Sequence, residues 1–223
     1  MSYVFFKKGI ERRCYWCYEN DKAKLTKDHL PPDCIFPKQD RIGLQLITAP
    51  ICNRCKVIHH TSDDDNNFLR HMHFWASLGS SSRDTHQKLQ ELIGYSSLAE
   101  DRGIVQAEYL DVELSSGQVV RYPILKGGSG SIARVLDSIA RAFYYRMRGE
   151  IIPENVSHSF VFKPQKSFTP PMNLLQGMRP CVVKNHVFEF SPVLFQEEEF
   201  RYLSWEFKFY SLPPLPIYYY YDL

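Results

Sequence analysis

The sequence has no run of about 18 apolar residues, the length that a membrane-spanning helix requires, so we expect no contact with a membrane. It also has no excess of one charge, because 25 Asp and Glu residues balance 27 Lys and Arg, for a net charge of +2. A polycation is thus excluded, and binding to nucleic acid would need positive charge concentrated on one part of the surface. The N-terminal lysines follow a short apolar stretch, the reverse of a secretory signal, so we expect a cytoplasmic protein.

Cysteine is also scarce, with 6 residues in a chain of 223, but four of them form two closely spaced pairs. In the cytoplasm, clustered cysteines hold metal ions more often than they form disulfides. Zinc binds four thiolates in a tetrahedron, and two pairs of the Cys-x-x-Cys type supply all four ligands from two turns of the chain. The alternative is that the cysteines only pack together in a compact core. We predict a structural zinc ion held by Cys14, Cys17, Cys52 and Cys55.

The remaining sequence alternates between short strands and helices. We expect strands at 24–30 and 44–49, each ended by a proline, and a helical stretch at 53–78 that a turn near Asp63 divides in two. A hairpin at 104–125 and a long amphipathic helix that begins near Ser131 should follow, and then strands to the end of the chain. In that helix Arg134, Arg141 and Arg148 recur every seven residues, which indicates a solvated face.

The segment between and after the cysteine pairs carries a further combination of residues. It contains Thr26-Lys27-Asp28-His29-Leu30-Pro31-Pro32, then Cys52-Asn53-Arg54-Cys55, then Ser62-Asp63-Asp64-Asp65. This combination resembles the HNH endonucleases, also called His-metal or ββα-metal fingers, and especially bacterial members whose cysteine pairs bracket an Asp-His-x-x-Pro strand end. The resemblance covers roughly residues 14–75. It implies an α+β protein, with a treble-clef-like ββα-metal zinc finger over residues 1–80 and a mixed helix and antiparallel-sheet module over 81–223.

The resemblance also implies an activity, the metal-dependent hydrolysis of DNA phosphodiester bonds. His29 takes the role of general base, which suits a side chain whose ordinary pKa lies near neutrality. Asp28 takes the role of ligand for a catalytic Mg²⁺ or Mn²⁺, since hard divalent ions prefer oxygen ligands. The alternative for Asp28 and His29 is a polar strand end in front of a proline turn.

One residue departs from the pattern of the family. The position directly after the second cysteine pair usually holds an Asn or His ligand, whereas this chain has Lys56, and a protonated lysine cannot bind a metal ion. Three explanations are open at this stage. His59 or His60 replaces the missing ligand, Lys56 contacts the phosphate directly, or the site is inactive and the protein only binds nucleic acid.

A DNA partner would be bound through phosphate contacts from basic residues near the predicted site, namely Lys27, Arg54 and Lys56. The resemblance further points to bacterial antiphage defence, where compact HNH proteins occur beside a protein partner such as an ATPase subunit. The competing interpretation is a catalytically degenerate, zinc-stabilised module for DNA binding or assembly.

Overall fold

The structure is a computed structural model, and it describes residues 9–36, 46–59, 61–75, 87–88, 107–113, 119–125, 129–156, 158–159, 181–183, 187–196, 200–210, 212 and 215–222. Its elements are, in chain order, β1 (Leu25–Leu30), the 3₁₀ helix η1 (Asp33–Ile35), β2 (Ile47–Cys52), α2 (Asn53–His59), α3 (Ser62–Trp75), β3 (Ala107–Glu113), β4 (Val119–Leu125), α5 (Ser129–Arg148), β5 (His158–Ser159), β6 (Cys181–Val183), β7 (Phe188–Gln196), β8 (Phe200–Phe209) and β9 (Leu215–Asp222). The expected mixture of helices and antiparallel sheets is therefore confirmed.

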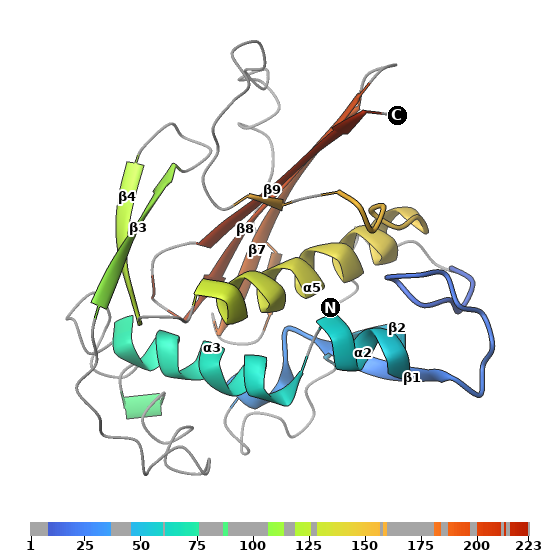
Figure 1. The fold of residues 1–223 in the computed structure, drawn as a ribbon, viewed down its shortest axis with the longest axis horizontal. Coiled ribbons are helices and arrows are strands. Elements are labelled where there is room, and N and C mark those ends of the chain that lie inside the picture. Colours follow the sequence, from blue (N-terminus) through green and yellow to red (C-terminus); the bar gives the residue numbers. More distant parts are fainter. Residues whose placement is uncertain are drawn as a thin grey trace.

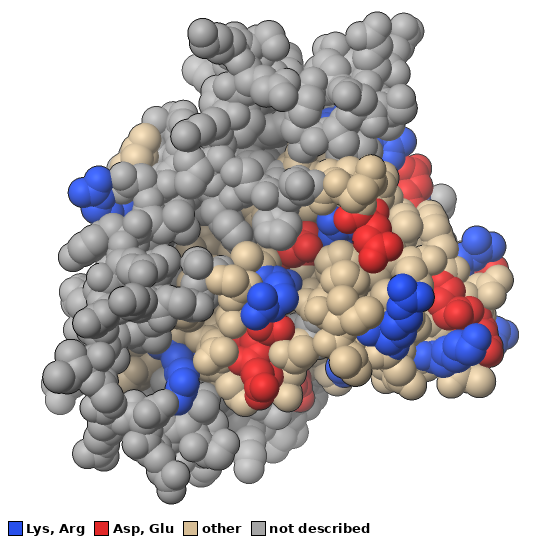
Figure 2. All heavy atoms as spheres, viewed as in Figure 1, with Lys and Arg blue, Asp and Glu red and all other residues tan. Residues whose placement is uncertain are grey.

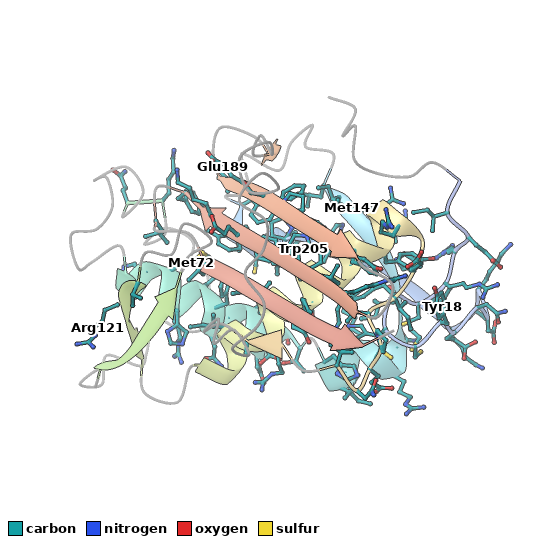
Figure 3. All side chains as sticks on the ribbon, turned by 90° about the horizontal axis from the view of Figure 1, so that it is seen from above. Tyr18, Met72, Arg121, Met147, Glu189 and Trp205 are labelled. Atoms are coloured by element: carbon teal, nitrogen blue, oxygen red, sulfur yellow. The ribbon has the colours of Figure 1, made fainter. Side chains whose placement is uncertain are left out.

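Three antiparallel sheets are present in the described residues. β1 pairs with β2, β3 pairs with β4, and a five-stranded sheet has the order β5-β9-β8-β7-β6. Figure 1 shows α5 crossing in front of the five-stranded sheet, with α3 alongside it. The β1–β2 hairpin and α2 lie toward one end of this arrangement and the β3–β4 hairpin toward the other, and Figure 3 marks these two ends with Tyr18 and Arg121.

The core lies between one face of the five-stranded sheet and the helices. Along β8 the side chains alternate, because every second one from Leu203 to Phe209 is buried while Glu206 and Lys208 are only partly covered. Phe143 of α5 packs on this face, 4.5 Å from the ring of Phe190 between centroids. One continuous buried cluster reaches from the first cysteine pair to β9, so the residues expected in two domains share a core. The predicted boundary near residue 80 lies outside the described residues.

The second strand does not end at Pro50 as expected; β2 runs through this proline to Cys52. Pro50 lies opposite Lys27, and its carbonyl accepts a hydrogen bond from the backbone N–H of Tyr15, on the side away from β1. The proline therefore occupies a non-hydrogen-bonded position of the ladder. Its missing N–H costs no pairing with β1, which is why a proline is tolerated inside this strand.

The predicted break in the helical stretch after the second cysteine pair is confirmed, because α2 ends at His59 and α3 begins at Ser62. Thr61 caps α3. Its hydroxyl accepts a hydrogen bond from the N–H of Asp64 at 3.2 Å, and the Asp64 carboxylate accepts one from the N–H of Thr61 at 3.2 Å. This reciprocal arrangement satisfies two backbone donors that the first turn would otherwise leave free.

Asp64 also joins α3 to α5. Its side chain is almost completely buried and accepts hydrogen bonds from Nε and Nη2 of Arg134 at 2.8 and 2.6 Å. Burial alone would raise the pKa of Asp64, but the hydrogen bonds from Arg134 and Thr61 outweigh it and hold the pKa below its ordinary value. The charged form is therefore the one that stabilises the fold.

The expectation of a solvated arginine face on α5 is wrong for Arg141, although Arg148 is exposed. The Arg141 guanidinium is 2% exposed and donates to Asp137 at 2.9 Å and to the carbonyl of Ile152 at 2.7 Å. The seven-residue spacing places the arginines on one side of the helix. The segment after α5 folds back over Arg141, whose guanidinium donates to the carbonyls of Ile152, Pro153 and Val156, and the spacing carries no information about that.

No helix among the described residues is long and apolar enough to span a bilayer.

The Asp64 contacts give a test of the fold. Asp64→Asn should lower the free energy of unfolding by about 2 kcal/mol at neutral pH, since a hydrogen bond to a charged group contributes roughly 1.5–3 kcal/mol. The folded pKa lies below the unfolded one, so this stabilisation is complete above the ordinary pKa of about 3.9 and is lost as the pH falls through the folded pKa. Urea unfolding at neutral and acidic pH measures both effects. The exposed neighbour Asp63 supplies the control Asp63→Asn, and equal stability of the two variants at neutral pH would contradict the assignment.

Candidate functional site

The four cysteines of the two pairs come together at the start of α2. The Sγ atoms of Cys14, Cys17, Cys52 and Cys55 all lie within 4.8 Å of one another, and Cys17 and Cys52 are 3.8 Å apart at their sulfurs. Zn–S bonds of about 2.3 Å in a tetrahedron place the sulfurs about 3.8 Å apart. The cysteine cluster, as we call these four residues, therefore fits a zinc ion in number, chemistry and spacing. In the part of the chain that the structure describes, it is the one group of three or more His, Cys, Asp or Glu side chains that fits a metal ion.

The backbone around each pair forms a tight turn that directs the thiols inward. The N–H of Tyr18 donates to the carbonyl of Cys14 at 3.0 Å, and the N–H of Cys55 donates to the sulfur of Cys52 at 3.4 Å. Tyr18 has a φ of 62°, a left-handed conformation that closes the first turn directly after Cys17. Three of the thiols are buried and that of Cys17 is exposed, so the cluster lies at the edge of the core.

The surroundings of these thiols shift their pKa values in different directions. Burial raises the pKa of the Cys14 and Cys55 thiols, and hydrogen bonds from the neighbouring cysteine thiols raise that of Cys55 further. For Cys52, the hydrogen bond from the Cys55 amide and contacts with nearby thiols outweigh burial and lower the pKa. The raised pKa values of Cys14 and Cys55 favour their protonated forms, so a metal ion that binds these thiols must displace their protons.

The predicted catalytic residues lie on β1, the strand that follows the first cysteine pair. Successive side chains of a strand point to opposite faces, and here Lys27 and His29 are exposed whereas Asp28 is 4% exposed. Asp28 pairs with Ala49 and His29 with Thr48 across the hairpin. The structure therefore places the two residues side by side in the chain but on different sides of the strand, with the carboxylate inside and the imidazole outside.

The Asp28 carboxylate is held by a residue of the first cysteine pair. The hydroxyl of Tyr15, which lies between Cys14 and Cys17, donates to Oδ2 of Asp28 at 2.7 Å. Both side chains are buried, and Ser138 of α5 lies beside the phenol. Burial raises the pKa of Tyr15 well above its ordinary value, and the negative charge of Asp28 raises it further, so the phenol stays a hydrogen-bond donor.

The basic residues predicted to bind nucleic acid point to solvent. Arg54 and Lys56 are exposed on α2, and so are the apolar side chains of Val57 and Ile58, at 74% and 54%. Lys56 follows the second cysteine pair directly, on the outer side of the helix. Figure 2 shows that basic and acidic residues are interleaved over the described part of the visible face, without one large positive patch.

His59, a predicted alternative ligand, packs on Trp16. The two rings are parallel within 9° and their centroids are 3.9 Å apart, while Nε2 of His59 lies 3.7 Å from Oε1 of Glu154. Burial lowers the pKa of His59, and this effect exceeds the opposing influence of Glu154. The imidazole is thus neutral at physiological pH and belongs to the packing of α2 on the first cysteine pair. His60, the other predicted alternative, lies outside the described residues.

The pattern of the sequence did not single out Tyr15 or Trp16, and it assigned Arg141 to a solvated face; these residues contact the region of the cysteine cluster. The guanidinium carbon of Arg141 lies 4.4 Å from the centroid of the Trp16 ring. The Trp16 ring therefore contacts both the imidazole of His59 and the guanidinium of Arg141. The signal available in the sequence was the pair of aromatic residues between Cys14 and Cys17, because large aromatic side chains in such a turn indicate that the turn packs on the core.

No protein-family model matches the chain, and neither a curated protein nor a solved structure matches it. The resemblance to the HNH group therefore rests on the residues of this chain alone. In the structure the strands β1 and β2 and the helix α2 lie next to four cysteines that can bind zinc.

The cysteine cluster makes a direct prediction about metal content. Purified protein should contain about one zinc ion per chain, and Cys14→Ser should lose it, because three thiolates do not complete the tetrahedral site. Binding of structural zinc supplies roughly 10–16 kcal/mol in zinc-finger peptides, so the variant should also lose much of its thermal stability. Elemental analysis and calorimetry measure both.

Cys34→Ser is the matched control. Cys34 lies outside the cysteine cluster, so this variant should keep its zinc ion. Zinc-free wild-type protein, or a Cys14→Ser variant that retains the ion, would contradict the site.

Proposed function

We propose that this protein is a zinc-stabilised HNH endonuclease that hydrolyses DNA phosphodiester bonds with Mg²⁺ or Mn²⁺. The observation that carries the proposal is the position of His29. Its imidazole is exposed on β1, next in sequence to a carboxylate that is fixed in place, and β1 pairs with the strand that leads into the second cysteine pair. An exposed imidazole on a paired strand is suited to act on a large substrate that cannot enter the core.

In this proposal each element supplies one part of the reaction. His29 accepts the proton of the attacking water as general base. The resemblance assigns Asp28 as a ligand of a divalent ion, which would neutralise charge on the phosphate and stabilise the leaving oxygen, although this carboxylate faces the buried side of β1, away from His29. Lys27 lies on the same exposed side of β1 as His29, and Arg54 and Lys56 project from α2, so these cations are placed to contact the DNA backbone. The cysteine cluster keeps β1 and α2 in register and takes no part in the chemistry.

A second candidate function is favoured by the surroundings of Asp28. This carboxylate is almost completely buried and accepts a hydrogen bond from Tyr15. In addition, Lys56, which cannot bind a metal ion, occupies the position where the HNH resemblance expects the second ligand. A protein with these features could bind DNA without cutting it, or assemble with a protein partner such as an ATPase subunit of an antiphage system. The exposed basic residues of α2 would then be the functional surface.

Replacing the proposed base separates these functions. His29→Ala should reduce nicking of supercoiled plasmid by about 100-fold or more, since general acid–base catalysis contributes roughly 10²–10⁴-fold. Zinc content and thermal stability should not change, because His29 is exposed. Gel assays with Mg²⁺, with Mn²⁺ and without added divalent ion measure the rate.

The matched control is His73→Ala, a histidine of α3 outside the candidate site, which should cut like the wild type. Equal cutting by His29→Ala would refute the base assignment. If the wild-type protein binds DNA but does not cut under any of these conditions, the second candidate is correct.

The basic residues of α2 can be tested in either case. Arg54→Gln should weaken binding to a DNA duplex and reduce the slope of log K against log salt by about 0.9, the value for one lost phosphate contact. Fluorescence anisotropy with a labelled duplex at several salt concentrations measures both quantities. Lys22→Gln removes the same charge from an exposed position before β1 and should leave the slope unchanged. The same slope in Arg54→Gln as in the wild type would remove α2 from the interface.

A further inference from the structure

The β1–β2 hairpin turns one of its two faces away from the core. Its inner face carries Asp28 and Ala49, which are 4% and 1% exposed and lie opposite each other. Side chains alternate along both strands, so the residues next to these two project to the other side. The outer face, as we call that side, consists of the exposed Lys27 and His29 from β1 and the half-buried Thr48 and Pro50 from β2.

The pairing of the two strands places Thr48 directly opposite His29. Pro50 has no N–H and occupies a non-hydrogen-bonded position opposite Lys27. Positions of this kind recur at every second pair of an antiparallel ladder, so His29 and Thr48 form the next one. The Cα atoms of such a pair are roughly 4.5 Å apart, and the two side chains project from the same face of the hairpin. The Thr48 side chain is therefore the cross-strand neighbour of the imidazole that the proposed function assigns as general base.

The outer face has the chemistry of a phosphate-binding surface. It carries the ammonium group of Lys27, the imidazole of His29 and the hydroxyl of Thr48, and none of its four residues is acidic. A phosphodiester has one negative charge and oxygen atoms that accept hydrogen bonds, and proteins bind it through lysine and threonine side chains among others. The outer face therefore complements a nucleic acid backbone both in charge and in hydrogen bonding. An apolar partner would leave three of its four side chains without matching groups.

We propose that Thr48 is a phosphate-binding residue, whose hydroxyl donates a hydrogen bond to a phosphate oxygen of the DNA and holds that phosphate beside the imidazole of His29. The proposal rests on the nuclease function put forward above and adds a contact from the strand opposite the general base. Because the contact is made to the backbone, it fixes the DNA strand at His29 without reading the bases. It involves only the outer face and is independent of the buried Asp28.

The test compares Thr48→Val with the wild-type protein as purified, full-length chains. Valine keeps the branched shape of threonine, so zinc content and thermal stability should not change. Binding to a labelled DNA duplex, measured by fluorescence anisotropy without added divalent ion, should weaken by roughly 10-fold, because a hydrogen bond to a charged acceptor is lost. The factor should be the same at all salt concentrations, since a neutral donor releases no counterion, whereas Lys27→Gln should reduce the slope of log K against log salt by about 0.9.

Plasmid nicking separates this role from that of the general base. Thr48→Val should raise KM by a similar factor and leave kcat nearly unchanged, because the contact is made both in the bound substrate and in the transition state. His29→Ala should lower kcat instead. Thr48→Ser keeps a hydroxyl at this position and should bind and cut like the wild type.

Thr26→Val is the matched control. Thr26 is half-buried like Thr48 and belongs to the same hairpin, but it lies on the same side of β1 as Asp28, away from the outer face. This variant should bind DNA like the wild type.

The proposal is overturned if Thr48→Val binds DNA like the wild type, if Thr26→Val or Thr48→Ser weakens binding equally, or if the wild-type protein does not bind DNA. Loss of zinc or thermal stability together with binding in Thr48→Val would also overturn it, because the role of Thr48 would then be structural. Failure of the nuclease function is distinguishable. A wild-type protein that binds the duplex without cutting it refutes that function, while the comparison of binding between Thr48→Val and the wild type still decides the Thr48 contact.

Discussion

The contact on which the candidate site depends is the convergence of two cysteine pairs that lie 35 positions apart in the chain. Four thiols at tetrahedral spacing bring the turn around Tyr15 and Trp16 against β2 and the start of α2. A zinc ion would stabilise this arrangement, because it binds the four thiols in their deprotonated form. With zinc, the same four groups become a fixed point from which β1 and α2 extend.

The long helix α5 supplies the second half of this support. Arg141 lies against Trp16 of the first cysteine turn and bonds to Asp137 and to the carbonyl of Ile152, and Ser138 lies beside Tyr15. Arg134, which lies near the N-terminal end of α5, donates a hydrogen bond to Asp64 of α3. The helix thus contacts the first cysteine turn through Ser138 and Arg141, and its Phe143 packs on the five-stranded sheet. A buried arginine with this many partners is costly to separate from them, so the helix and the cysteine turn behave as one unit.

The candidate site lies where this rigid unit meets solvent. On β1 a buried carboxylate and an exposed imidazole are adjacent, and on α2 two basic side chains point outward beside two exposed apolar ones. Alternation along a strand is enough to produce the first arrangement, because neighbouring side chains must point to opposite faces. The exposed imidazole can reach a large substrate, whereas the buried carboxylate is held by Tyr15 on the other side of the strand.

The sequence by itself determined the features that depend on local spacing. The Cys-x-x-Cys pairs predicted the cysteine cluster, the acids after Thr61 indicated the start of α3, and the three- and four-residue spacing of apolar side chains predicted α5. Only the tertiary structure decided which groups are covered. It buried Arg141 on a face expected to be solvated, extended β2 through Pro50 because the proline lies at a position without a ladder hydrogen bond, and placed Tyr15 against Asp28. Each of these depends on a segment remote in sequence, and local patterns carry no information about what packs against them.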